Sequence, residues 1–256
     1  MVGDGKLESV REEINLGMWR QEELEKVIRK AAQIPLTGRK IDFISWHFLG
    51  TDYREGTLIG NEETPEKFVV DFSGVDCFTV LDYVEAVRLS DSFSAFRNNL
   101  ARVRYRSGII AFDHRNHFFS DWGIFHGDFI EDVTVEVGGG HTRSSGKRLN
   151  VKEDGTFYLP GITPIERTVD YIPASAIHES VLRKCKTGDY VGIYAEDPGL
   201  DVTHVGIFIR GRGKAYLRHA SSLTEYRKVI DQDFLAFMVR KPGFLVFRPR
   251  ATKNRS

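Results

Sequence analysis

The stretch Asp76–Ala86, with the sequence DCFTVLDYVEA, decides how this chain is interpreted. Apolar residues recur in it at helical spacing, at Val80, Leu81 and Val84, and the pattern continues to Val87. The spacing predicts a helix that begins at the cysteine of this stretch and ends near residue 89.

Cys77 therefore stands where a helix begins. Unpaired backbone N–H groups and the positive end of the helix dipole lie at that position, and both favour a thiolate, which is the nucleophilic form. Asp76 is expected to cap the helix with its carboxylate, although its negative charge opposes the thiolate. From these residues alone, the more ordinary interpretation is a small buried cysteine of the core.

Composition narrows the class of protein. The chain has 256 residues, and its 36 basic residues balance 36 acidic ones, so charge gives no argument for a nucleic-acid partner. The two cysteines, Cys77 and Cys185, do not make a disulfide framework. No apolar run reaches the roughly 18 residues of a membrane span, which predicts no stable membrane insertion. The first residues, MVGDGK, do not resemble a signal peptide, so the sequence leaves the compartment open.

The order of predicted elements indicates an α+β architecture, with helices early and antiparallel strands late. We expect amphipathic helices within residues 7–32 and a second helix after the cysteine helix, capped by residues 90–92. Residues 138–147 are expected to form a flexible loop. Strands are expected at residues 68–72, 129–137, 190–195, 203–210, 215–221 and 244–247.

Two histidines decide between the interpretations of Cys77. If Gly211-Arg212 forms a two-residue turn, residues whose numbers sum to 423 lie opposite each other, and His204 and His219 satisfy that condition. Opposed residues share one face of a sheet, with Cβ atoms about 5 Å apart. Such a pair is either an unusual structural contact or the base and orienting group of a cysteine nucleophile.

Together these motifs resemble the NlpC-type papain-like cysteine peptidases and amidases of bacterial cell walls. More narrowly, three further segments resemble the N-acetylmuramoyl-L-alanine amidase-like branch of that superfamily. The first resemblance rests on DC at 76–77, THVGI at 203–207, HAS at 219–221, KTGDY at 186–190 and GTDY at 50–53. The second rests on residues 96–100, RYRSG at 104–108 and RNHFFSDW at 115–122.

The resemblance implies a papain-like fold in which N-terminal helices precede a nucleophile helix packed on an antiparallel sheet. It implies Cys77 as nucleophile, His204 as general base and then acid, and His219 as the group that orients His204. The backbone N–H of Cys77 would donate to the developing oxyanion. No cofactor and no metal are implied. We expect a helical extension over residues 1–37, one domain over 38–250 with an insertion at about 107–185, and a tail over 251–256.

Substrate contacts follow from the same resemblance. Tyr53 would hydrogen-bond near the thiolate or the scissile carbonyl, while Arg115, His117 and Asp121 would line the substrate groove. Trp122 would stack on a sugar ring. The alternatives are a buried polar network that braces the insertion and, for the tryptophan, a place in the core. The sequence departs from the expected pattern at residues 78 and 81–83 and at position 52, where aspartate replaces proline, so substrate choice is left open.

The implied function is a cysteine amidase that cleaves the N-acetylmuramoyl–L-alanine bond of peptidoglycan or muropeptides, on the exported side of a bacterial membrane. A stem-peptide endopeptidase would carry the same triad. A non-catalytic wall-binding module would require an incomplete one. A metal-dependent hydrolase is a further alternative, and its ligands would come from Asp113, His114, His117 and His126.

Overall fold

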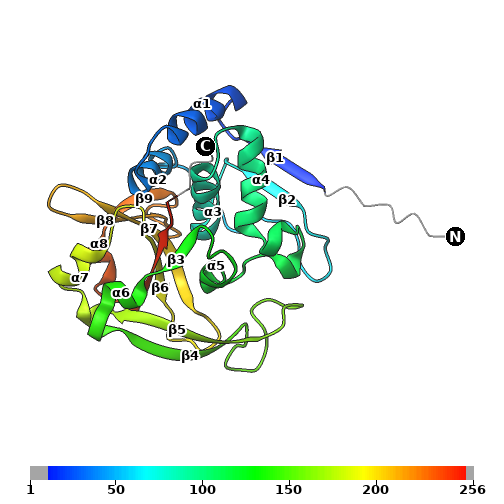
Figure 1. Cartoon of the computed structure of the whole chain (residues 1–256). Helices are drawn as coiled ribbons and strands as arrows, with labels where there is room; N and C mark the ends of the chain where they lie inside the picture. Colours follow the sequence, from blue (N-terminus) through cyan, green and yellow to red (C-terminus); the bar gives the residue numbers. More distant parts are fainter. Residues whose placement is uncertain (1–10, 252–256) are drawn as a thin grey trace.

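The computed structural model describes residues 11–251 (Figure 1). The first half of these residues is mainly helical, and the second half forms most of a large antiparallel sheet. The helices are α1 (Gln21–Ala32), α2 (Thr37–Trp46), α3 (Cys77–Arg88), α4 (Phe93–Arg104), α5 (Phe119–Phe125), α6 (Thr134–Gly138), α7 (Glu179–Lys184) and α8 (Phe234–Met238). The strands are β1 (Glu12–Asn15), β2 (Phe68–Asp71), β3 (Ile130–Asp132), β4 (Arg143–Leu149), β5 (Ile165–Pro173), β6 (Tyr190–Tyr194), β7 (Val202–Arg210), β8 (Ala215–Ala220), β9 (Val229–Asp233) and β10 (Gly243–Pro249).

The large sheet has the strand order β4-β5-β10-β6-β7-β8-β9, and β3 pairs with β10. All of its pairings are antiparallel. A separate two-stranded sheet joins β1 to β2 in parallel. The fold is thus a mixed α+β fold with an antiparallel sheet and helices, as the sequence predicted.

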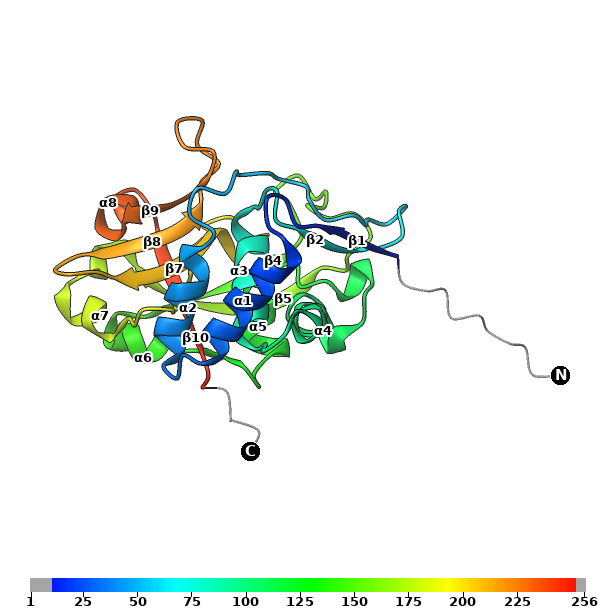
Figure 2. The ribbon, with the colours of Figure 1, turned by 90° about the horizontal axis from the view of Figure 1, so that it is seen from above.

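Both faces of the central strands β6 and β10 are buried, and strand alternation assigns their side chains to one of two cores. On β6, Tyr190 and Tyr194 belong to the larger core, whereas Val191 and Ile193 belong to the smaller one. Helices α1–α4 lie over the face of the sheet that contributes to the larger core. Helices α6–α8 lie away from them, as Figures 1 and 2 show from two directions. Helix α3 is packed against β7 and β8, the strands that carry the histidines.

Several sequence predictions about local structure are wrong. Residues 12–15 form a strand and not a helix, and only α1 of the predicted N-terminal helical stretch is present. The part of that stretch before Arg11 lies outside the described residues. Residues 129–137 divide into β3 and α6, and the predicted loop at 138–147 contains most of β4. Strand β9 and helix α8 were not predicted.

The predicted division into extension, domain and tail stays a prediction. Helix α1 packs on α2, α3 and α4 and buries Leu24, Ile28 and Ala31 in the larger core. The extension is therefore packed onto the rest of the protein. Only residue 251 of the predicted tail lies within the described part of the chain. Between residues 11 and 251 no helix is long and apolar enough to span a bilayer.

Candidate active site

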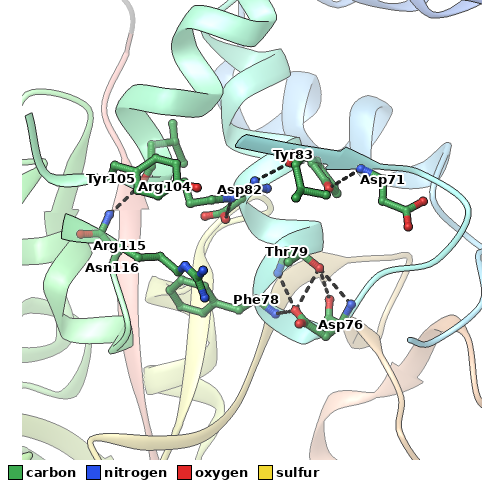
Figure 3. Close-up of polar contacts among 12 residues, drawn as sticks. Asp71, Asp76, Phe78, Thr79, Asp82, Tyr83, Arg104, Tyr105, Arg115 and Asn116 are labelled. Atoms are coloured by element: carbon green, nitrogen blue, oxygen red, sulfur yellow. Dashed lines mark hydrogen bonds and ion pairs between the residues drawn. The ribbon is translucent and has the colours of Figure 1, made fainter. Parts of the chain in front are cut away.

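Helix α3 begins at Cys77 because Asp76 caps it. One carboxylate oxygen of Asp76 accepts hydrogen bonds from the backbone N–H of Phe78 at 2.9 Å and of Thr79 at 2.7 Å. The Thr79 hydroxyl accepts in return from the backbone N–H of Asp76 at 2.9 Å, which completes a capping box (Figure 3). The predicted cap and the predicted end of the helix near residue 89 are both confirmed.

This cap leaves one amide of the first turn free. The amides of Phe78 and Thr79 go to the Asp76 carboxylate, and that of Val80 goes to the Asp76 carbonyl. Among the described residues, the backbone N–H of Cys77 has no hydrogen-bond acceptor outside its own residue. A free N–H at the start of a helix is a donor suited to an oxyanion.

The thiol of Cys77 lies at the sheet. Backbone N–H groups of Val205, Cys77 and Phe78 lie close enough to the thiol to lower its pKa, and Val205 directly follows His204 on β7. Burial raises the pKa of this thiol to about 12, with a further rise from the charge of Asp76 and only partial opposition from those three amides. The helix terminus was expected to favour the thiolate, but burial has the larger effect on the pKa of this thiol.

The two histidines meet, although not in the predicted register. Strands β7 and β8 are joined by the four-residue loop Gly211–Lys214, in which Gly213 takes a φ of 76°. Opposed residues such as Arg210 and Ala215 therefore sum to 425 and not to 423. A shift of two residues keeps every side chain on its face, so the histidines become diagonal neighbours. Nε2 of His204 lies 2.8 Å from Nδ1 of His219.

The histidine pair packs against an aromatic ring, with His219 buried and His204 partly buried. Phe237 of α8 packs against both rings, with centroids 6.0 Å from His204 and 5.1 Å from His219. Burial lowers the pKa of His204 to about 3, and proximity to His219 and Lys241 lowers it further. Burial likewise lowers the pKa of His219 to about 4, against a hydrogen bond to Gln232 that raises it. Both imidazoles are therefore neutral at pH 7, and so is the thiol.

Gln232 is the residue of this site that sequence reasoning missed. Its Oε1 lies 3.2 Å from Nε2 of His219, on the side of the ring away from His204. It comes from β9, which was not predicted as a strand. A glutamine one position from the end of an undetected strand gives no sequence signal, whereas the pairing of β8 with β9 makes it a neighbour of His219.

Tyr53 lies close to the start of α3, and its proposed contact with the substrate stays a prediction. Its ring is partly buried and packs against the larger core, and an isolated bridge joins Tyr53 to Val75, one residue before the helix cap. Burial raises the pKa of Tyr53, and the nearby Cys77 and Asp76 raise it further. The guanidinium of Arg227 lies over the ring, 4.8 Å from its centroid. The structure thus places Tyr53 under the exposed guanidinium of Arg227 and beside the segment that leads into α3.

The proposed groove residues Arg115, His117 and Asp121 are engaged in hydrogen bonds of their own. Arg115 makes a two-pronged ion pair with the buried carboxylate of Glu66, and its side chain is 13% exposed. Asp121 accepts from the backbone N–H groups of His117 and Phe118 and pairs with Arg167 at 2.7 Å. These contacts fit the alternative of a polar network that braces this segment.

The remaining contact of His117 also points inward. Its Nε2 lies 2.7 Å from the carbonyl oxygen of Phe112, and the ring packs edge-on against the Phe112 ring. Burial lowers the pKa of His117 to about 4, partly opposed by this hydrogen bond. The imidazole is therefore neutral at pH 7, and its Nε2 is engaged with the Phe112 carbonyl.

The prediction of Trp122 as a sugar platform is wrong. Its side chain is 0% exposed, because α5 turns this residue into the core. The indole packs against the rings of Phe78, Phe119 and Tyr190. The alternative interpretation, a core tryptophan, describes it correctly. Through Phe78 it supports the first turn of α3.

A buried ion pair connects α3 to neighbouring elements. Arg104 of α4 donates to the Asp82 carboxylate at 2.9 Å and to the carbonyl of Val69 on β2 at 2.6 Å (Figure 3). Both charged side chains are 1% exposed. Since Asp82 lies on the same helix as Cys77, the pair ties the nucleophile helix to both α4 and β2.

The four residues of the metal-site alternative do not converge on one point. Nδ1 of His114 faces the carbonyl of Arg106 at 3.3 Å, and Nε2 of His126 lies 2.6 Å from Nδ2 of Asn116. Across residues 11–251 there is no group of three or more His, Cys, Asp or Glu side chains that could hold a metal ion. The three imidazoles contact backbone carbonyl or side-chain amide groups, whereas a metal site would need their lone pairs free.

The chain matches a known protein family and resembles several solved structures. A family model described as AmiA-like, N-acetylmuramoyl-L-alanine amidase-like, matches residues 43–244. An N-acetylmuramoyl-L-alanine amidase from Bacteroides uniformis is 28% identical, with a TM-score of 0.68 over 84% of this chain and 99% of that chain. No curated protein is significantly similar to the chain.

Two other solved structures share the fold. A Legionella pneumophila protein superposes with a TM-score of 0.73 at 21% identity, over 89% of this chain and 95% of that chain, which is a likeness of fold alone. A Bacteroides fragilis structure, provisionally described as a xylanase, is 27% identical with a TM-score of 0.63, over 80% of this chain and 99% of that chain.

Proposed function

The chain belongs to the AmiA-like, N-acetylmuramoyl-L-alanine amidase-like family, and from that premise we propose that it is a cysteine amidase of peptidoglycan or muropeptides. The bond is the amide between N-acetylmuramic acid and L-alanine. Cys77 is the nucleophile, His204 the general base and then acid, and His219 the orienting group. One observation carries the proposal: Cys77 is the first residue of a helix packed on β7 and β8, and His204 and His219 of those two strands lie 2.8 Å apart, Nε2 to Nδ1.

We also assign the fold to the papain-like, NlpC-type class. Support comes from the position of the cysteine at the start of a helix packed on β7 and β8, and from the two histidines on those adjacent strands. In that arrangement the helix terminus meets the base at the sheet, which is the constellation that acyl transfer requires.

The reaction starts from neutral groups. As the sulfur attacks the carbonyl carbon, the thiol proton passes to the free Nδ1 of His204, while its Nε2 stays bonded to His219. The free N–H of Cys77 stabilises the negative charge that develops on the carbonyl oxygen. Because burial opposes both the thiolate and the imidazolium, proton transfer accompanies attack and does not precede it as a resting ion pair.

Collapse of the tetrahedral intermediate breaks the C–N bond. His204 returns the proton to the departing amine of L-alanine, which leaves with the stem peptide, and the muramoyl group remains on Cys77 as a thioester. Water, deprotonated by His204, then cleaves the thioester to the free acid and restores the thiol. Tyr53, next to the thiol, hydrogen-bonds the carbonyl side of the substrate.

A stem-peptide endopeptidase is the nearest competing function, because it would use the same three residues. Mass spectrometry of digested muropeptides separates the two activities. The proposal expects intact stem peptides that begin with L-alanine, together with sugar products that lack peptide. Fragments cut inside the stem, with the L-alanine still joined to the sugar, would show the endopeptidase instead.

Two other classes are tested by inhibition and by the site itself. We expect activity to survive EDTA and to be lost with iodoacetamide, and the reverse pattern would show a metal-dependent hydrolase. A wall-binding module without activity would leave Cys77 unreactive.

A xylanase needs two carboxyl groups flanking a sugar bond. At the start of α3, however, Asp76 is used as the cap and Asp82 pairs with Arg104.

A peptidoglycan substrate places the working enzyme at the cell envelope. We therefore propose a location outside the cytoplasmic membrane, with peptidoglycan or its fragments as the partner and no nucleic acid. The proposal includes no cofactor, since each step uses only side chains and backbone groups of this site.

A further inference from the structure

The histidine pair continues into a third side chain. On β8 and β9, His219 is opposite Ile230, and Leu217 is opposite Gln232. Gln232 is therefore a diagonal neighbour of His219 on the same face of the sheet. Its Oε1 lies 3.2 Å from Nε2 of His219, and Nδ1 of that ring lies 2.8 Å from Nε2 of His204. A continuous chain of three side chains thus runs from β9 to β7.

This chain determines where the protons are. An amide oxygen only accepts hydrogen bonds, so Nε2 of His219 must carry its proton, and a neutral imidazole then has a lone pair on Nδ1. That lone pair accepts from His204, which places the proton of His204 on Nε2. Nδ1 of His204 is therefore left as the unprotonated nitrogen.

We propose that Gln232 is a positioning residue that fixes the tautomers of both histidines, so that Nδ1 of His204 is free to take the proton of the Cys77 thiol. The inference rests on the roles proposed above for Cys77 and His204. If the amide presented its NH2 group instead, His219 would carry its proton on Nδ1 and donate it to His204. His204 would then be protonated on Nδ1, where no base would remain.

Other groups around the pair do not supply this constraint. Phe237 covers the rings but has no hydrogen-bonding atom. Asp231 acts on His219 only through its charge, and its carboxylate is taken up by Arg218 at 2.7 and 2.8 Å. Lys241 acts on both rings as a like charge and disfavours the protonated forms. Among the described residues, Gln232 is the only hydrogen-bond partner of Nε2 of His219.

The direct test is 15N NMR of the histidine rings in the full chain. We expect both His204 and His219 to be protonated on Nε2 in the wild type. In Gln232→Met, which is similar in length but has no acceptor, both tautomers of His219 should be populated. In Gln232→Glu, an acceptor only, the wild-type tautomers should persist. A wild-type spectrum with His219 protonated on Nδ1 would overturn the proposal, whether or not either variant folds.

The second readout is the rate at which iodoacetamide alkylates Cys77, measured against pH. We expect Gln232→Met to lower the rate about tenfold to a hundredfold, because part of the population loses its base. Gln232→Glu should keep the rate and move the acid limb of the profile to higher pH, because a carboxylate favours the imidazolium. Gln33→Met, the same change at an exposed helix end, is the control.

These outcomes separate the inference from the proposed function. Neither the NMR spectrum nor the alkylation rate requires a substrate. Both therefore still test the role of Gln232 if the wild type fails to release stem peptides from muropeptides. If muropeptides are cleaved but Gln232→Met keeps the wild-type rate and pH profile of alkylation, the amidase assignment stands and Gln232 has no positioning role.

Discussion

Asp76 has two opposed effects on Cys77, and substitution can separate them. Its carboxylate caps α3 through the amides of Phe78 and Thr79, while its charge raises the pKa of the neighbouring thiol. Asp76→Asn keeps an oxygen for the cap and removes the charge, since Asn and Asp are equally good caps. Asp76→Ala removes both. We expect the first variant to have a more acidic thiol and the second to be less stable as well.

The magnitudes follow from the contacts. Asp76→Ala leaves two partly buried amides unpaired, so the free energy of unfolding should fall by about 1–2 kcal/mol. That corresponds to roughly 2–8 °C in Tm for a chain of this size. Asp76→Asn should lose only a few tenths of a kcal/mol. If the pKa of the thiol falls by about one unit, the thiolate fraction at pH 7 and the alkylation rate of Cys77 rise about tenfold.

The assay is iodoacetamide alkylation at pH 7, followed by mass spectrometry of Cys77, together with thermal unfolding of each variant. Ser92→Ala is the matched control, because Ser92 caps α4 through the amide of Ala95 and carries no charge. It should lose stability without changing the alkylation rate. If Asp76→Asn is alkylated no faster than the wild type, the reasoning that its charge restrains the thiol is refuted.

Three further predictions concern stability and catalysis. Arg104→Met leaves Asp82 buried without its partner, and we expect it to lower the free energy of unfolding in urea by about 3–5 kcal/mol; a loss below 1 kcal/mol would contradict the role of the pair. Tyr53→Phe should lower kcat on muropeptides with little change in Tm. A kcat equal to that of the wild type would show that Tyr53 has no role in the site. The protein should lose stability as the pH falls from about 6.5 toward 4, because an unfolded chain binds protons that the buried imidazoles reject; His126→Gln should make this loss less steep, and a flat profile would contradict the burial argument. The lowered pKa values are those of His117, His126, His204 and His219.

The part of the site that the sequence predicted rests on local rules. Helical spacing and an acidic cap place Cys77 at the start of α3, and a period of two places both histidines on one face of a hairpin. That second prediction survived an error of two residues in the register, because only the parity of the shift decides the face. The length of the β7–β8 loop is what the sequence could not supply.

The parts that failed depend on distant partners. Strand β1 exists only because β2, more than fifty residues later, pairs with it. The inward orientation of Trp122 depends on the phase of the short helix α5, which Asp121 sets by capping its start and pairing with Arg167. The pKa of Cys77, which is partly buried, depends on how the finished fold shields the thiol from water, and that effect outweighs the helix terminus. None of these is encoded at neighbouring positions.

The central claim is that Cys77 is the nucleophile of an amidase, and the most direct test compares Cys77→Ala with Cys185→Ala. Cys185 is the other cysteine of the chain, and it is buried in the smaller core. Each purified variant is incubated with muropeptides, and release of stem peptides that begin with L-alanine is followed by mass spectrometry. We predict release by the wild type and by Cys185→Ala, and none by a folded Cys77→Ala. Release of that peptide by Cys77→Ala would contradict the claim.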